Sequence, residues 1–270
     1  MIINSTLKIT AQQLFKKYNP KPSFSRVVIG IGYTGVELLI ENNSYLGVAY
    51  TLPDVLSDKE CTKIDFAGIL TEKPVSDLLQ WSLEPPSIRK IVGIATLNAV
   101  SQYLLMKDES YESLEEDLFH YLRVDNGSSI TFIGLIKPMI RRLSKTTKKI
   151  TIIEKNLELG PFFKQFTLAR NIKELNEEEL RTDILICTGT ALINGTLDHI
   201  LDVYRHHADF IALIGPTASL LPDFLFDNGV DLVGGMFFNN PAASLRILQE
   251  GGGTKFFKKY GRKYNLIPTE

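Results

Sequence analysis

The sequence predicts an α/β protein in which a small α+β domain precedes a doubly wound, Rossmann-like sheet. Two apolar runs, 183–187 and 210–214, are too short for helices and flank an amphipathic segment, which is typical of buried parallel strands joined by a crossover helix. Before residue 108 strand-like segments come first and helical ones follow, whereas after residue 128 the two kinds alternate. We therefore expect two domains, 1–108 and 109–270.

The first domain is expected to begin its sheet at residue 24 as an antiparallel meander, because short turn signals separate three apolar segments. Pro74 is expected to begin a helix that runs to about Leu83, since the first helical position needs no amide proton. A second helix follows over 87–105. The three expected strands are 24–32, 35–41 and 45–52.

The second domain is expected to contain five parallel strands joined by helices with right-handed crossovers. Ligands of open α/β sheets collect at the carboxyl ends of such strands, so the residues that follow each strand are candidates for binding. The five expected strands are 129–136, 149–156, 183–192, 209–218 and 230–238.

Composition and charge narrow the class of protein. Of the 270 residues, 44% are hydrophobic and 23% charged, as in soluble globular proteins. A net charge of -1 supplies no global field for nucleic acid or an anionic membrane, so anion recognition would be local. No apolar run approaches the roughly 20 residues of a membrane span, and the N-terminus lacks a signal-peptide pattern. We expect a cytoplasmic protein.

Direct metal ligation is not predicted. The two cysteines, Cys61 and Cys187, are far apart and show no CxxC or Cys/His spacing, which excludes a disulfide framework and argues against a structural zinc site. There are four histidines, and those on the helix after residue 195 lie off its apolar stripe and are expected to face solvent. The four histidines are His120, His199, His206 and His207.

Small and hydroxyl-bearing residues follow the expected strands and make up most of the candidate site. They bring backbone amides and hydroxyl groups close to a bound group, and helix N-termini favour anions. The three glycines after the last helix suggest a backbone that bends closely around something. The candidates are Gly134, Pro138, Thr188, Gly189, Thr190, Asn194, Gly195, Thr196, Gly215, Pro216, Thr217, Gly251, Gly252 and Gly253.

Two further candidates are polar residues in notable places. Glu154 closes the second strand of the sheet, 20 residues after Gly134, where Rossmann-type domains place an acidic group against a ribose diol. The alternative is a solvated carboxylate beside Lys155. Asn98 is polar within an otherwise apolar helix and normally needs a partner, so we expect it to face Thr188 and Thr217 across the domain interface.

Six stretches in this order resemble the DUF364 family, labelled as heavy-metal chelation proteins. The residues before about 90 resemble the DUF4213 domain that commonly precedes it. The resemblance implies an enolase N-terminal-like α+β domain fused to a Rossmann-like domain with partial similarity to methyltransferases, and a cleft between them. It directs attention to the candidate residues named above other than Glu154. The stretches are IVGIATLNAV, FIGLIKP ending at Pro138, TGTALINGTLDHIL, GPTASLLPD, GVDLVGG and EGGGTKFFKKYGRK.

The favoured hypothesis is that a small polar molecule, anionic or heterocyclic, binds in the cleft between the domains. The protein would then be either an enzyme acting on a metal chelator or on a pterin- or flavin-like compound, or a ligand-sensing protein. One alternative is a non-catalytic protein that binds metal or a metal chelate. Another is a methyltransferase-like enzyme using S-adenosylmethionine, favoured by Glu154 and opposed by the missing GxGxxG loop. The sequence names no cofactor, and it leaves the oligomeric state open, a homodimer included.

Overall fold

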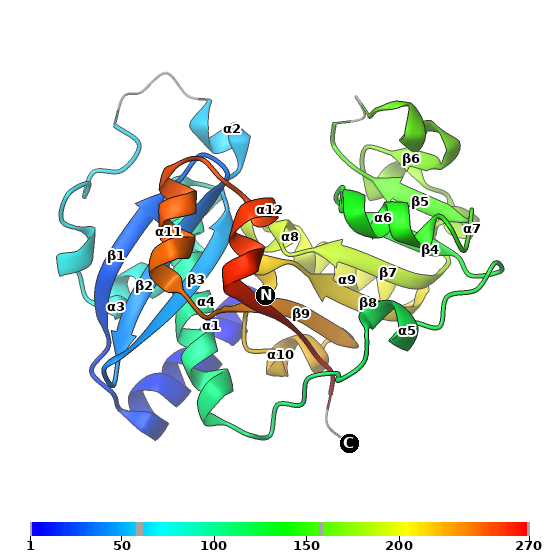
Figure 1. The fold of residues 1–270 in the computed structure, drawn as a ribbon. Helices are drawn as coiled ribbons and strands as arrows, with labels where there is room; N and C mark the ends of the chain where they lie inside the picture. The colour runs from blue at the N-terminus through cyan, green and yellow to red at the C-terminus, as the bar shows by residue number, and fades with distance from the viewer. Residues whose placement is uncertain (1, 58–61, 157–158, 269–270) are drawn as a thin grey trace.

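The computed structural model describes residues 2–57, 62–156 and 159–268, so Cys61 lies outside the described residues. The chain forms two lobes, each built on one sheet, with the long helix α4 (Ile88–Lys107) between them (Figure 1). The first lobe contains a three-stranded antiparallel sheet of order β1-β2-β3, which confirms the expected meander. Its strands are β1 Ser23–Ile29, β2 Tyr33–Ile40 and β3 Asn43–Tyr50.

Helix α4 is buried all round, with 17 of its 20 residues buried, because it packs on this sheet on one side and on the second lobe on the other. A Cβ at Gly47 of β3 would lie 2.0 Å from the carbonyl oxygen of Ala95, so only glycine allows α4 to approach β3 this closely. Helix α11 (Pro241–Gln249) covers the other face, where Leu245 and Leu248 pack near Gly35.

The second lobe contains a seven-stranded sheet of order β10-β9-β8-β7-β4-β5-β6, in which only the β9–β10 pairing among the described residues is antiparallel. The chain winds outward from β4 in one direction and from β7 in the other, so the strand order reverses between these two strands. The strands are β4 Ile130–Ile133, β5 Ile150–Ile153, β6 Thr167–Ala169, β7 Thr182–Thr188, β8 Ala208–Ile214, β9 Leu232–Phe238 and β10 Gly261–Leu266.

The expected α/β architecture is therefore confirmed as a parallel-rich sheet beside a small antiparallel one, while the Rossmann-like and enolase-like descriptions remain predictions. The five strands expected in the second lobe correspond to β4, β5, β7, β8 and β9. Two strands were missed, β6 and β10. Strand β6 has only three residues. In β10 the charged residues Arg262 and Lys263 interrupt the apolar pattern, although Tyr264 and Leu266 are buried.

The two lobes interlock in sequence. Helix α11 comes late in the chain but packs on the first sheet, and α1 (Ile2–Gln12), which was not expected, packs on α10 (Asp223–Phe226) of the second lobe. The boundary at residue 108 remains a prediction.

No described helix is long and apolar enough to span a membrane. The remaining helices are α2 Pro53–Leu56, α3 Val75–Gln80, α5 Leu118–Tyr121, α6 Lys137–Leu143, α7 Glu177–Leu180, α8 Thr190–Asn194, α9 Leu197–Tyr204 and α12 Thr254–Phe257, with a π-helix at Gln13–Tyr18 and 3₁₀ turns at Leu70–Glu72, Trp81–Leu83, Pro161–Gln165, Ile172–Glu174, Pro216–Ala218 and Lys258–Tyr260.

Candidate ligand-binding site

The ends of β4 and β7 meet at the reversal of strand order. Gly134 follows β4 with a φ of 89°, a left-handed conformation that favours glycine. A Cβ at Gly134 would lie 2.4 Å from Cγ2 of Thr188, the last residue of β7. The sequence thus brings two of the predicted residues into direct contact, at the place where open parallel sheets bind ligands.

Hydroxyl groups gather just beyond this contact. Oγ1 of Thr188 lies 3.2 Å from Oγ1 of Thr190, and both side chains are half-buried. Gly189 between them is buried, and a Cβ there would lie only 2.6 Å from the backbone nitrogen of Ala218. The loop after β7 therefore packs directly on the loop after β8 and presents two neighbouring hydroxyl groups.

The loop after β8 joins the site to the first lobe. Gly215 has a φ of 126°, and the chain then forms the 3₁₀ turn at Pro216–Ala218. The backbone N–H of Tyr50, at the end of β3, donates to Oγ1 of Thr217 at 3.0 Å. The carboxamide of Asn98 on α4 donates to the carbonyl oxygen of Thr217 at 3.0 Å.

Asn98 is fully buried, and its described hydrogen bonds do not include Thr188. The expectation that it faces Thr217 is confirmed, although the contact is with the backbone. Its Oδ1 has no hydrogen-bond partner among the described residues. Asn98 therefore connects the two lobes behind the site.

Two tyrosines that sequence reasoning missed flank the site on the first lobe. The ring centroids of Tyr33 and Tyr50 are 5.5 Å apart with an interplanar angle of 73°, and Tyr33 also packs on Phe257 of α12 at 5.2 Å. Burial raises the pKa of Tyr33, and a hydrogen bond with Thr254 partly opposes that shift. Their positions at the start of β2 and the end of β3, opposite each other in register, were the available signal.

The predicted triple glycine lies beside these aromatic rings. A Cβ at Gly253 would contact the Tyr33 ring at 3.8 Å, and one at Gly252 would lie 2.4 Å from Cγ2 of Ile247. Gly251 has a φ of 75° and follows Glu250, the C-cap residue of α11. The three glycines thus carry the chain closely past the start of β2, next to the tyrosines rather than next to Thr188.

Glu154 lies on the other side of the β4 turn. Its Oε2 accepts the backbone N–H of Leu135 at 3.1 Å, and the side chain is half-buried. The carboxylate therefore faces the turn that follows β4, at the strand end where a diol partner was expected. Its role toward a ligand remains a prediction.

Four predicted residues are exposed and take no part in the contact between Gly134 and Thr188. Asn194, Gly195 and Thr196 are exposed and lie at the opposite end of α8 from Thr190. Pro138 is exposed in the first turn of α6. The sequence places these residues on helix ends correctly, but the length of α8 separates Asn194, Gly195 and Thr196 from the strand ends.

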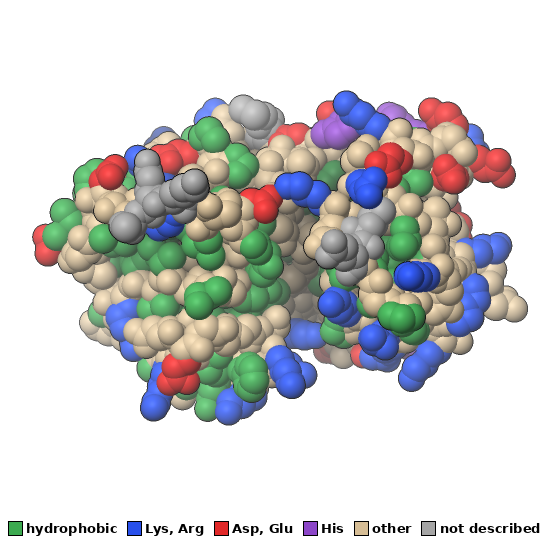
Figure 2. Space-filling model, turned by 90° about the horizontal axis from the view of Figure 1, so that it is seen from above, with side chains coloured by type: hydrophobic (Ala, Val, Ile, Leu, Met, Phe, Trp, Pro, Cys, Tyr) green, Lys and Arg blue, Asp and Glu red, His purple; other side chains and the backbone are tan. Residues whose placement is uncertain are grey.

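A hollow separates the two halves of the molecule when it is viewed from above (Figure 2), and in Figure 1 α8 and the end of β7 lie between these halves. One exposed ion pair crosses from lobe to lobe, with Nζ of Lys155 2.7 Å from Oδ2 of Asp54. Lys155 follows Glu154, and Asp54 is four residues beyond Tyr50. Residues next to the candidate site thus contact each other across the two lobes.

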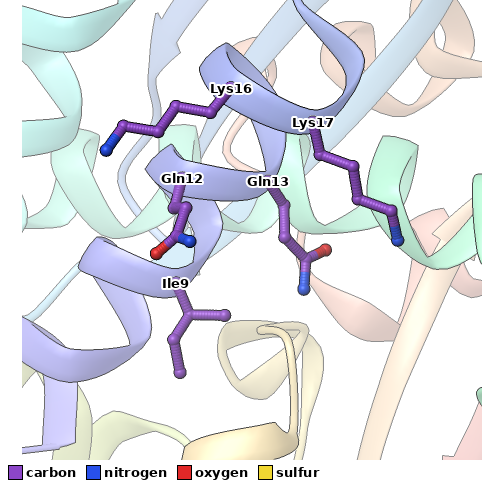
Figure 3. Close-up of a pocket in the computed structure, with 5 residues that line it drawn as sticks. All are labelled: Ile9, Gln12, Gln13, Lys16 and Lys17. Atoms are coloured by element: carbon purple, nitrogen blue, oxygen red, sulfur yellow. The ribbon is translucent and has the colours of Figure 1, made fainter.

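Two surface pockets lie elsewhere on the described chain. One of about 390 Å³ is lined by a single helical segment (Figure 3), and Lys17 there pairs with Asp108 at 3.1 Å. Another of about 410 Å³ lies beside Trp81 and contains the ion pair between Arg89 and Glu84. Neither pocket includes a predicted site residue. The residues that line the first pocket are Ile9, Gln12, Gln13, Lys16 and Lys17.

Among the described residues, no group of three or more His, Cys, Asp or Glu side chains could hold a metal ion. Cys187 is fully buried, and burial raises the pKa of its thiol to about 12. His199 and His206 are exposed, as expected, and His120 is exposed as well. The expectation was wrong for His207, which is only 18% exposed because its ring lies between the carbonyl oxygen of Val203 and the carboxylate of Glu177.

Comparisons with known proteins cover nearly the whole chain. The family model DUF364, described as "Putative heavy-metal chelation", matches residues 117–267, and the model DUF4213, with the same description, matches residues 15–101. An uncharacterized protein of Methanocaldococcus jannaschii is 26% identical over 235 residues, which are 85% of each chain.

Two crystal structures have the same fold. One is a protein with unknown function from the DUF364 family of Pyrococcus horikoshii, with a TM-score of 0.79 and 26% identity over 99% of this chain and 100% of that one. The other, from the same family in Desulfitobacterium hafniense, has a TM-score of 0.75 and 16% identity over 99% and 98% of the two chains. The second likeness is one of fold alone.

Proposed function

Since this chain belongs to the DUF364 family, we propose that it binds a small polar molecule with a planar ring between its two lobes, and that any heavy metal reaches it as a complex with such a molecule. The observation that carries the proposal is the contact between Gly134 and Thr188 at the reversal of strand order. Thr217, bonded to Tyr50 of the other lobe, lies on the next strand end.

The chemistry of these residues indicates the kind of ligand. Threonine hydroxyls donate and accept hydrogen bonds, and glycine-rich turns let a ligand approach backbone amides. The rings of Tyr33 and Tyr50 pack on each other, and the backbone N–H of Tyr50 contacts Thr217, so aromatic residues adjoin the site, which favours a planar heterocycle. This donor set suits an organic molecule better than a bare metal ion, because thiolates, imidazoles and carboxylate clusters are the usual transition-metal ligands.

A second candidate is a ligand with a ribose-like diol, as in S-adenosylmethionine. The observation that favours it is the hydrogen bond from Leu135 to Glu154, which holds a carboxylate at the turn after β4. A carboxylate at this position can accept two hydroxyl protons. The two candidates differ in whether Glu154 contributes to affinity.

The test is a thermal-shift and calorimetric panel of pterin, flavin, nucleoside and organic chelator compounds, the last with and without bound nickel, cobalt or zinc. Thr188→Val removes a hydroxyl at the site while keeping its shape and should weaken binding by roughly tenfold, as expected when one hydrogen bond of about 1.4 kcal/mol is lost. Thr167→Val, an exposed threonine on β6, is the matched control. Binding that survives Thr188→Val unchanged, or tight stoichiometric binding of free metal ions, would contradict the proposal.

A further inference from the structure

Lys90 is a charged residue that the candidate site does not use. It belongs to the first turns of α4 and is only 5% exposed. Its ammonium nitrogen lies 3.6 Å from the position that a Cβ would take at Gly195, so it reaches across to the turn between α8 and α9. Among the described residues, no hydrogen bond or salt bridge engages this ammonium group, although Asp198 exerts an electrostatic attraction on it.

The turn that Lys90 approaches contains the Asn194, Gly195 and Thr196 motif. All three residues are exposed, and Gly195 ends α8 with a φ of 69°. Thr196 precedes α9, an eight-residue helix, and its side chain makes no capping hydrogen bond. The hydroxyl group of Thr196 and the first amide groups of α9 are thus available near a cation, with the positive end of the helix dipole beside them.

The local charges determine what can bind there. Burial lowers the pKa of Lys90, while Asp198 in the first turn of α9 raises it. The Asp198 carboxylate also accepts the backbone N–H of Ile2 at 2.8 Å, so it is engaged by α1. An anionic ligand near Lys90 would be attracted by the ammonium group and by the helix N-terminus. The Asp198 carboxylate would repel it.

We propose that the α8–α9 turn binds a phosphate group, free or as a monoester, between Lys90 and the N-terminus of α9. A phosphate has several acceptor oxygens and can accept from an ammonium group, a hydroxyl group and backbone amides together. Because Asp198 opposes it, we expect a dissociation constant on the order of 1 mM. The site is distinct from the one between the lobes, since α8 separates Asn194 from Thr190.

The test follows amide resonances of Gly195 and Thr196 during titrations with inorganic phosphate and with glycerol phosphate, at constant ionic strength. Saturable shifts are expected with inorganic phosphate, and a response to glycerol phosphate as well extends the site to monoesters. Lys90→Met should weaken binding at least about tenfold, the effect of losing roughly 1.4 kcal/mol, while Lys90→Arg should retain it. Lys107→Met is the control on the same helix, because Lys107 pairs with Glu41 far from this turn.

Shifts that do not saturate, or equal affinity in Lys90→Met, would overturn the proposal and leave Lys90 as a partner of Asp198 alone. If Lys90→Met does not fold, Thr196→Val decides the matter, since it removes the uncapped hydroxyl from an exposed position. If Thr196→Val lowers the affinity for phosphate at least about threefold, the result supports the site. An unchanged affinity overturns it.

Discussion

The side chain of Asn98 donates to the carbonyl oxygen of Thr217 at 3.0 Å and to that of Val48 at 2.8 Å. Val48 lies in β3 of the first lobe, and Thr217 lies in the 3₁₀ turn that follows β8 in the second. One fully buried carboxamide therefore fixes the distance between the first sheet and a strand end of the candidate site. Gln102, one turn further along α4, donates to the carbonyl oxygen of Met236 at 2.6 Å and extends this connection to β9.

Replacing Asn98 by Ala should lower the free energy of unfolding by about 1 to 3 kcal/mol, because two buried carbonyl groups lose their donor. Urea unfolding monitored by circular dichroism measures the effect. Asn43→Ala, which removes an exposed asparagine bonded to the carbonyl oxygen of Glu41, is the control and should change stability little. If Asn98→Ala lowers the free energy of unfolding as little as the control does, Asn98 does not hold the lobes together.

The interlocking of the lobes leads to a second prediction. The fragment 1–108 lacks α11, whose Leu245 and Leu248 bury one face of the first sheet together with Val28, Leu46 and Val48. The fragment 109–270 lacks α1 and α4, which pack against it. Each fragment alone should therefore expose apolar surface and lack cooperative unfolding, whereas the two mixed together should regain it. Well-dispersed amide spectra from either isolated fragment would contradict this expectation.

The same interlocking explains why the sequence predicted individual elements better than their assembly. Turn signals between apolar segments identified β1 to β3, and a long apolar pattern identified α4. These patterns gave no sign that α11 packs on the first sheet, since the apolar stripe of a helix does not name the surface that it covers. Tyr33 and Tyr50 were missed for a related reason, because only the pairing of β2 with β3 brings them together.

The candidate site was predicted where it depends on strand ends and missed where it depends on helix length. Thr188 ends a parallel strand, and Gly134 and Thr217 lie just after two others, whose carboxyl ends share one edge of the sheet. Thr190 and Asn194 are close in sequence but occupy opposite ends of α8. A motif that spans a short helix is therefore divided by the fold between two places.

His207 should make stability depend on pH. Hydrogen bonds with the carbonyl oxygen of Val203 and with Glu177 raise its pKa above the ordinary value. A raised pKa means that the stabilisation is fully present below the unfolded value of about 6.5 and is lost as the pH rises through the folded value. His207→Gln should thus destabilise the protein more at about pH 5.5 than at about pH 8.5.

Thermal unfolding at the two pH values measures this difference, with His199→Gln on α9, the helix that precedes His207, as the control. If His207→Gln lowers the stability by the same amount at both pH values, the His207 ring stabilises the protein by packing alone. Glu177→Gln should reproduce part of the effect, because the Glu177 carboxylate is one of the two partners of the ring.

The last prediction concerns Glu154, which decides between a diol-bearing ligand and other heterocycles. Its Oε2 accepts the N–H of Leu135 at 3.1 Å, and Glu154→Gln retains an oxygen that can do the same, so the fold should be unaffected. If a ligand diol donates to the carboxylate, the substitution replaces charge-assisted hydrogen bonds of about 1.5 to 3 kcal/mol with weaker ones and should reduce affinity roughly tenfold or more.

Calorimetry with adenosine, S-adenosylmethionine, NAD, flavin and pterin compounds measures the affinities of wild type and Glu154→Gln. Glu174→Gln is the matched control, because the Glu174 carboxylate also accepts a backbone N–H, that of Arg170 at 2.8 Å, but lies beyond β6. Should a diol-bearing ligand bind wild type and Glu154→Gln equally, or should only ligands without a diol bind, the methyltransferase-like alternative is wrong. Glu154 would then serve to hold the turn after β4, and affinity would depend on Thr188, Thr217 and the two tyrosines.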